Sequence, residues 1–340
     1  MILDCKKLNG EAKKLSDYLK SKIISQDESI DEVCSGIQKY FVGLSDTNKP
    51  LFNFLFAGPT GSGKTKIVQE IAKYFDLEPV VIDCGEIQQQ HELSKLLGAP
   101  PGYIGHGETK PLLSKERIEI QGKPNVILFD EVEKATGGLY NVLLGILDNG
   151  YVTTNSNVKV SFLNCLVFMT CNIGAKEIES EENKIGFSKK SLTWEEKQAY
   201  TTKEIKKKFL PEFINRLDKM IVFKQLTRED VEHIFELELN QIQERLNNCE
   251  YKKIFLFVSP EAKRKIVDVG YSIQYGARNL KRVMEKEIIQ PISNALSLDE
   301  VEEGDSIQLE VNPAGEFFFE KKIYSRTKSK ACWISVLEIV

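Results

Sequence analysis

Residues 58–65 have the types and spacing of a loop that binds phosphate groups. They read Gly-Pro-Thr-Gly-Ser-Gly-Lys-Thr and match the pattern G-x-x-x-x-G-K-[ST]. Small residues let backbone N–H groups surround a chain of phosphates, while the Lys64 ammonium can contact the outer phosphates and the Thr65 hydroxyl can bind Mg²⁺. The pattern predicts that a nucleoside triphosphate is bound by Gly58, Pro59, Thr60, Gly61, Ser62, Gly63, Lys64 and Thr65. A glycine-rich turn without a ligand is the alternative, and kinases, GTPases and motors all share the motif.

A pair of acidic residues follows a separate apolar segment. Val126-Ile127-Leu128-Phe129 precedes Asp130 and Glu131, and the carboxyl end of such a strand faces the ligand crevice of an open α/β sheet. Asp130 would hold Mg²⁺, and Glu131 would orient and deprotonate an attacking water. An exposed acidic turn would look the same in isolation. The phosphate-binding loop earlier in the chain favours the catalytic interpretation.

The segments around these residues alternate between strand and helix patterns. Four buried strands are expected, at 51–56, 80–83, 125–129 and 162–169. The residues that follow the phosphate-binding loop repeat with helical spacing: Ile67, Val68, Ile71 and Ala72. This alternation predicts an α/β fold, with a parallel sheet that helices cover on both faces. Ser25 to Glu28 has the spacing of a capping box at the start of an earlier helix.

The pattern changes near residue 226, where a second, smaller α+β domain is expected. Thr227 to Asp230 would cap a long helix, and two shorter helices and three strands follow it. We therefore divide the chain into a large domain, a small domain and an unassigned tail, at 1–225, 226–322 and 323–340. Residues 331–337 of that tail, Ala-Cys-Trp-Ile-Ser-Val-Leu, could form an extra strand, a docking segment or a frayed end.

The composition excludes several classes of protein. Lys and Arg number 46 against 50 Asp and Glu, a formal net charge of −4 in 340 residues, which argues against a nucleic-acid binder. No apolar run approaches the roughly 20 residues that span a bilayer, so no membrane partner is expected. Seven scattered cysteines without a C-x-x-C pair indicate a reducing compartment, and the cytoplasm is expected. Three dispersed histidines give no zinc-ligand spacing.

Four motifs in a fixed order make the chain resemble a known family. They are Gly98 to Gly105, Asp130 to Ala135, Pro211 to Asp218 and Gly276 to Arg278. From about Leu15 to Lys322 the chain is similar to the Clp-type AAA+ unfoldases, specifically the second ATPase module of the ClpA/ClpB/ClpC group. The resemblance implies a P-loop AAA+ sheet followed by a smaller lid domain. It also implies ATP and Mg²⁺ as cofactors, a homo-oligomer with the family's hexameric ring, and a polypeptide substrate threaded through the pore.

The resemblance assigns roles that spacing alone does not. Asn172 becomes the first sensor, Arg216 the finger that reaches a neighbour's ATP, and Arg278 the second sensor. From the residues alone, either arginine could be a surface residue or a salt-bridge partner. Ile23 and Ile24 fall where the family packs adenine, and they fit the core at the entry of a helix equally well.

Two loops carry further expectations from the family. Tyr103 would project into the pore and grip unfolded chain, although a packed Tyr in a Pro-Gly turn is the alternative. Ile185, Gly186 and Phe187 match the position of a tripeptide that docks a ClpP-like peptidase, and a small hydrophobic anchor is the alternative. A nucleotide-gated scaffold or regulator that threads no substrate remains the other function to consider. A DNA-acting motor is disfavoured by the charge balance.

Overall fold

The computed structural model describes residues 8, 10–99, 111–173, 193–272 and 276–322. These residues form two compact units. The first lies within Met1–Ile234 and Tyr271–Arg278, and the second within Phe235–Gly270 and Asn279–Val340. The first turns of the long helix that starts at Arg228 belong to the first unit. In that part of the helix, Asp230 accepts a hydrogen bond from the Ser25 hydroxyl. The division into domains at residue 226 stays a proposal.

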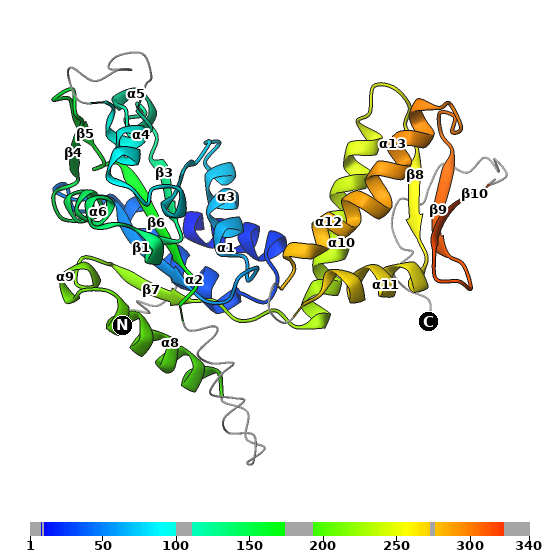
Figure 1. The fold of residues 1–340 in the computed structure, drawn as a ribbon, viewed down its shortest axis with the longest axis horizontal. Coiled ribbons are helices and arrows are strands. Elements are labelled where there is room, and N and C mark those ends of the chain that lie inside the picture. Colours follow the sequence, from blue (N-terminus) through cyan, green and yellow to red (C-terminus); the bar gives the residue numbers. More distant parts are fainter. Residues whose placement is uncertain (1–7, 9, 100–110, 174–192, 273–275, 323–340) are drawn as a thin grey trace. The chain divides into compact units, whose positions relative to one another are not determined.

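The first unit contains a five-stranded sheet in which every neighbouring pair of strands is parallel (Figure 1). Its order is β2-β3-β6-β1-β7. The strands are β1 (Phe52–Ala57), β2 (Val80–Asp83), β3 (Asn125–Asp130), β6 (Cys165–Cys171) and β7 (Lys219–Val222). The predicted α/β fold with a parallel sheet is confirmed. The sequence patterns missed β7, a four-residue strand at the sheet edge. They placed the start of β6 three residues early and its end two residues early.

Alternating side chains of these strands form two separate cores. Phe54, Phe56 and Phe168 pack on one face with the helices α1 (Gly10–Lys22), α2 (Asp27–Phe41) and α3 (Lys64–Tyr74). Leu55 and Phe129 point to the opposite face, which α4 (Leu93–Leu97), α6 (Gly137–Asn149) and α8 (Trp194–Lys208) cover. Burial on both faces explains why β1, β3 and β6 read as largely continuous apolar runs.

Shorter elements complete the first unit. They are the single turns η1 (Cys84–Glu86), η2 (Gln90–Glu92) and η3 (Val132–Lys134), the short helices α5 (Lys115–Ile118) and α9 (Pro211–Ile214), and the hairpin of β4 (Tyr151–Thr153) and β5 (Lys159–Ser161). Among the described helices of the chain, none combines the length and apolar character that a membrane crossing requires.

The second unit is a small α+β arrangement, as expected. Its sheet has the order β10-β9-β8, with β9 antiparallel to β10 and parallel to β8. The strands are β8 (Phe255–Val258), β9 (Ser306–Val311) and β10 (Phe317–Lys322). The helices are α10 (Arg228–Asn247), whose first turns belong to the first unit, α11 (Pro260–Gly270), α12 (Arg278–Met284), the π-helical turn η4 (Glu285–Ile289) and α13 (Gln290–Ser297).

The two expected helix caps have different outcomes. Thr227 and Asp230 exchange backbone-to-side-chain hydrogen bonds of 2.8 and 3.2 Å at the start of α10, which confirms the cap predicted there. The prediction of a capping box at Ser25 is wrong, because α2 begins after Gln26 and has no side-chain cap. The Ser25 hydroxyl donates its hydrogen bond to Asp230 instead. Gln26 is buried, and its side-chain amide donates hydrogen bonds to the carbonyl oxygens of Ser62 and Lys224.

The close approach of α2 to the sheet leads to a stability prediction. A Cβ on Gly36 would lie 2.5 Å from Cζ of Phe54 and 2.9 Å from Cε1 of Phe52, and these two rings are stacked. We expect Gly36→Ala to lower the free energy of unfolding by up to about 2 kcal/mol, because overpacking costs about 1–3 kcal/mol and better helix propensity offsets about 1 kcal/mol. Urea denaturation followed by circular dichroism measures this loss.

The matched control is Gly145→Ala in α6. The nearest atom to a Cβ at Gly145 is the carbonyl oxygen of Tyr151, 3.8 Å away, so the same substitution meets only ordinary contact. Gly145→Ala should leave stability unchanged or raise it by up to about 1 kcal/mol. Equal stability of the two variants would contradict the steric explanation.

Candidate functional site

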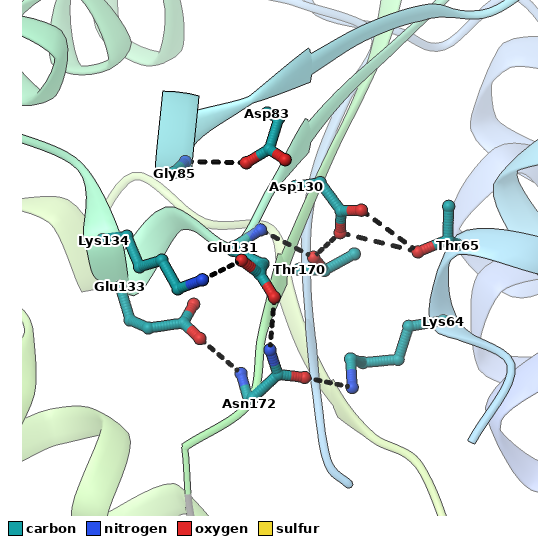
Figure 2. Close-up of polar contacts among 10 residues, drawn as sticks. All are labelled: Lys64, Thr65, Asp83, Gly85, Asp130, Glu131, Glu133, Lys134, Thr170 and Asn172. Atoms are coloured by element: carbon teal, nitrogen blue, oxygen red, sulfur yellow. Dashed lines mark hydrogen bonds and ion pairs between the residues drawn. The ribbon is translucent and has the colours of Figure 1, made fainter. Parts of the chain in front are cut away.

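The carboxyl edge of the five-stranded sheet brings the predicted site segments together. The loop 58–65 follows β1, Asp130 ends β3, and Asn172 directly follows β6. Because β6 lies between β1 and β3, the carboxyl ends of the three strands are adjacent. Segments far apart in the sequence therefore meet in one cluster, as Figure 2 shows.

Three glycines shape the loop. Gly58, Gly61 and Gly63 have φ values of 138°, 76° and 99°, which residues with a Cβ rarely adopt. A Cβ on Gly58 would also lie 2.7 Å from the carbonyl oxygen of Phe223. Gly63 is the N-cap of α3, and no side chain caps this helix end. The first N–H groups of α3 can therefore bind an anion.

The Lys64 ammonium is buried among neutral oxygen atoms. Nζ lies 2.7 Å from the Gly58 carbonyl oxygen, 2.8 Å from that of Pro59 and 3.0 Å from Oδ1 of Asn172. Burial lowers the pKa of Lys64 to about 8, since the ammonium loses water. None of these three acceptor oxygens has a formal negative charge. The phosphate oxygens of a nucleotide would therefore supply the negative charge that pairs with the Lys64 ammonium.

Thr65 and Asp130 face one another between α3 and β3. Oγ1 of Thr65 lies 3.5 and 3.4 Å from the two carboxylate oxygens of Asp130. Thr170 on β6 donates its hydroxyl to Asp130 and accepts a 3.0 Å hydrogen bond from the backbone N–H of Glu131. A hydroxyl and a carboxylate are the oxygen ligands that Mg²⁺ uses beside phosphate oxygens and water. The donor set therefore fits Mg²⁺.

Glu131 lies one residue beyond β3, where the chain turns away from the sheet. Its φ of 55° is uncommon for a residue with a Cβ. Oε1 accepts a 3.2 Å hydrogen bond from Nδ2 of Asn172, and Oε2 forms an ion pair with Lys134. The amide of Asn172 thus connects Glu131 to Lys64, and the Glu131 side chain keeps 27% of its surface exposed. A water molecule can reach this carboxylate.

Three contacting residues were missed by the sequence analysis. Thr170 orients Asp130 and Glu131, Lys134 pairs with Glu131, and Oε1 of Glu133 accepts a 3.1 Å hydrogen bond from the backbone N–H of Asn172. Burial raises the pKa of Glu133. The available signal was the position of Thr170, directly after the predicted strand 162–169 and two residues before Asn172, because alternate residues of an extended chain lie on the same side of the sheet.

Gly276 to Arg278 lies beside the phosphate-binding loop. A Cβ on Gly276 would be 3.0 Å from the carbonyl oxygen of Gly61, and Gly276 has a φ of 54°. Burial lowers the pKa of Lys64 most, the carboxylates of Glu133 and Asp130 oppose this shift, and the positive charge of Arg278 lowers the pKa further. The exposed Arg278 guanidinium is therefore near the position where phosphates would bind.

The two predicted adenine contacts occupy different environments. Ile23 is 5% exposed and belongs to the core with Leu19 and Ile30, yet its Cγ2 would lie 3.9 Å from a Cβ on Gly63. Ile24 is half-buried. Both the adenine-packing and the core interpretations agree with this placement.

The remaining predicted residues do not join the cluster. Arg216 binds Asp148 of α6 through two contacts of 3.1 Å and donates to the carbonyl oxygen of Glu212 at 2.8 Å. Tyr103 and the tripeptide Ile185-Gly186-Phe187 lie outside the described residues.

Two sequence profiles match most of the chain. The profile of the AAA domain (Cdc48 subfamily) matches residues 49–220, and that of the C-terminal, D2-small domain of ClpB protein matches residues 226–309.

Individual relatives agree with these profiles. Chloroplastic chaperone protein ClpC1 of Arabidopsis thaliana is 37% identical over 310 residues, covering 89% of this chain and 33% of the relative. Chaperone protein ClpB 1 of Synechococcus elongatus is 37% identical over 301 residues, covering 87% of this chain and 33% of the relative. A structure of Hsp104 with ATPγS and FITC casein aligns with a TM-score of 0.75 at 28% identity, covering 94% of this chain and 53% of that one. The chain thus spans about a third of the length of the curated relatives that it matches.

Proposed function

Because the chain belongs to the AAA family and continues into a ClpB-type D2-small domain, we propose that it is an ATP-hydrolysing protein unfoldase of the Clp type. The observation that supports this most strongly is the cluster of Lys64, Asp130, Glu131 and Asn172 at one edge of the sheet. It contains a buried cation for phosphate, a carboxylate for Mg²⁺ and a carboxylate beside a neutral amide for water.

Each residue of the cluster has a separate task in this proposal. The N–H groups of the loop and Lys64 hold the phosphates, while Thr65 and Asp130 hold Mg²⁺, which neutralises charge on the phosphate oxygens when bound. Glu131 accepts the proton of the attacking water. Asn172 positions that water without competing for its proton, and the positive charge of Arg278 stabilises phosphate charge. Thr170 orients both acidic groups through its hydroxyl.

A ring of identical subunits is part of the proposal. Arg216 binds Asp148 and Glu212 and makes none of the described contacts with the loop of its own chain. Its guanidinium would leave Asp148 to reach the ATP of a neighbouring subunit. A hexamer is the ring that the Clp resemblance implies.

The substrate is proposed to be an unfolded polypeptide. The Hsp104 structure that aligns with this chain contains casein, and Tyr103 would grip such a chain in the pore. Ile185, Gly186 and Phe187 would dock a ClpP-like peptidase. We place the protein in the cytoplasm, a reducing compartment that suits the free thiols of Cys34, Cys84, Cys165, Cys171 and Cys249. The net charge of −4 disfavours nucleic acid as a partner.

The test follows a tagged fluorescent protein during incubation with ATP. We expect ATP-dependent loss of its fluorescence, and we expect Tyr103→Ala to lose this activity while still hydrolysing ATP. Tyr103→Phe is the matched control, because it keeps the ring that contacts substrate. Peptide products that appear only with added ClpP-like peptidase would support docking through residues 185–187.

Two outcomes would overturn the proposal. ATP hydrolysis without any unfolding would favour a nucleotide-gated scaffold. Full unfolding by Tyr103→Ala would remove the role of Tyr103 in gripping the chain.

A further inference from the structure

The second unit has an apolar hollow that the proposed ATPase function does not use. Its volume is about 520 Å³, and it lies between α10, the turn η4 and α13. Ile242, Leu246, Tyr251, Ile289, Ile292 and Leu296 form most of its wall. A hollow of this size and composition can receive one or two large apolar side chains.

The rim of the hollow continues into an acidic loop. Tyr251 is 60% exposed, and its hydroxyl donates a 3.0 Å hydrogen bond to Asp299. Lys252 holds the same loop through Asp299 and the carbonyl oxygen of Val301, at 2.6 and 2.8 Å. Within residues 299–305, five are acidic: Asp299, Glu300, Glu302, Glu303 and Asp305. The loop therefore joins the hollow at one end to strand β9 at the other.

The chain leaves the small sheet beside this same loop. Lys322 is the last residue of β10 and is paired with Ser306, the first residue of β9. Lys321 forms a 2.5 Å ion pair with Asp305. The next eight residues, 323–330, include Arg326, Lys328 and Lys330 and no acidic residue. A basic segment thus follows directly where a cluster of carboxylates begins.

An apolar segment follows the basic one, and the length of chain between it and Lys322 is sufficient to reach the hollow. Residues 331–337 read Ala-Cys-Trp-Ile-Ser-Val-Leu. An extended chain rises at most about 3.6 Å per residue, so Trp333 can reach about 40 Å from Lys322, whereas the loop from Asp299 to Ser306 spans at most about 25 Å. Trp333 can therefore reach the hollow next to Asp299.

We propose that residues 331–337 dock into the hollow of their own second unit, with Trp333 or Ile334 between α10 and α13 and the basic residues 326–330 along the acidic loop 299–305. In this arrangement the basic segment lies against the acidic loop, and the apolar segment that follows it lies against the apolar wall of the hollow. The order of charged and apolar residues along the tail therefore matches the order of the surfaces that they would contact. Docking also covers Tyr251 and Leu298, which are 60% and 68% exposed. This inference does not depend on ATP hydrolysis or on threading.

The experiment uses Trp333 as its own probe in the full chain. The chain has two tryptophans, and Trp194→Phe leaves Trp333 alone. Its emission should be blue-shifted and resist acrylamide quenching, compared with a synthetic peptide of residues 323–340. Ser293→Arg places a large cation at the exposed rim of the hollow and should return both properties to those of the free peptide. Raising the salt concentration should act in the same direction, because it screens the charged segment.

The matched control is Val269→Arg, also in the Trp194→Phe chain. Val269 is 53% exposed on α11 and lines a different hollow of the same unit, so Trp333 should be unaffected. Unchanged circular dichroism verifies that both variants fold. The proposal is overturned if Trp333 resembles the free peptide before any rim substitution, or if Ser293→Arg has no effect. Protection of Trp333 that disappears on dilution would instead assign the hollow to the tail of a second copy, and would also overturn it.

Discussion

Glu131→Gln is expected to reduce ATP turnover by about 10²–10⁴-fold, the range that a positioned general base contributes. Glutamine keeps the size of the side chain and can still accept the hydrogen bond from Asn172. It cannot accept a proton from water. Lys64, Thr65 and Asp130 are unchanged, so ATP should bind as in the parent protein. Phosphate release measures turnover, and calorimetric titration with ATP measures binding.

Glu86→Gln is the matched control for this substitution. Glu86 is exposed in η1 and belongs to the same sheet edge, but it makes none of the site's hydrogen bonds. Turnover by this variant should equal that of the parent. Normal turnover by Glu131→Gln would remove the proposed role of Glu131, whereas loss of ATP binding would indicate that the ion pair with Lys134 supports the shape of the loop.

The sequence best predicts those parts of the site whose functional residues are close together in the chain. The loop 58–65 contains its own glycines, cation and hydroxyl, and Asp130 and Glu131 follow directly on the apolar strand that positions them. Continuous apolar runs likewise predicted β1 and β3, since strands buried on both faces have no polar alternation. The apolar run of β2 was also predicted, although this strand is largely exposed or half-buried. The α/β fold and its parallel sheet follow from these patterns, whereas the AAA+ assignment rested on the family resemblance.

The missed contacts depend on which strands become neighbours. Thr170 meets Asp130 only because β6 pairs with β3 in a particular register. The sequence does not reveal that register, and a shift by one residue would turn Thr170 to the opposite face. Ser25 shows the same limit, because its hydroxyl binds Asp230, 205 positions away, rather than its own helix. Arg216 and Arg278 needed the family resemblance for a similar reason.

Arg216→Ala is expected to lower ATP turnover by about 10³–10⁵-fold without weakening ATP binding to the same subunit. A guanidinium that acts on a neighbour's phosphates affects hydrolysis at the interface, while Lys64 and the loop still bind nucleotide. Asp148→Asn is the control, because it removes the carboxylate that Arg216 contacts and leaves the guanidinium in place. We expect this control to keep turnover.

Mixing two inactive variants separates a shared site from an internal one. In a ring that contains both Arg216→Ala and Glu131→Gln subunits, some Arg216→Ala subunits have an intact Glu131 and receive Arg216 from a Glu131→Gln neighbour. Those interfaces contain one complete set of groups, so turnover should return to part of the parent rate and depend on the mixing ratio. If Arg216 acted within its own chain, every subunit would still lack one group and the mixture would remain inactive. An inactive mixture whose subunits are shown by crosslinking to co-assemble would therefore exclude a finger in trans.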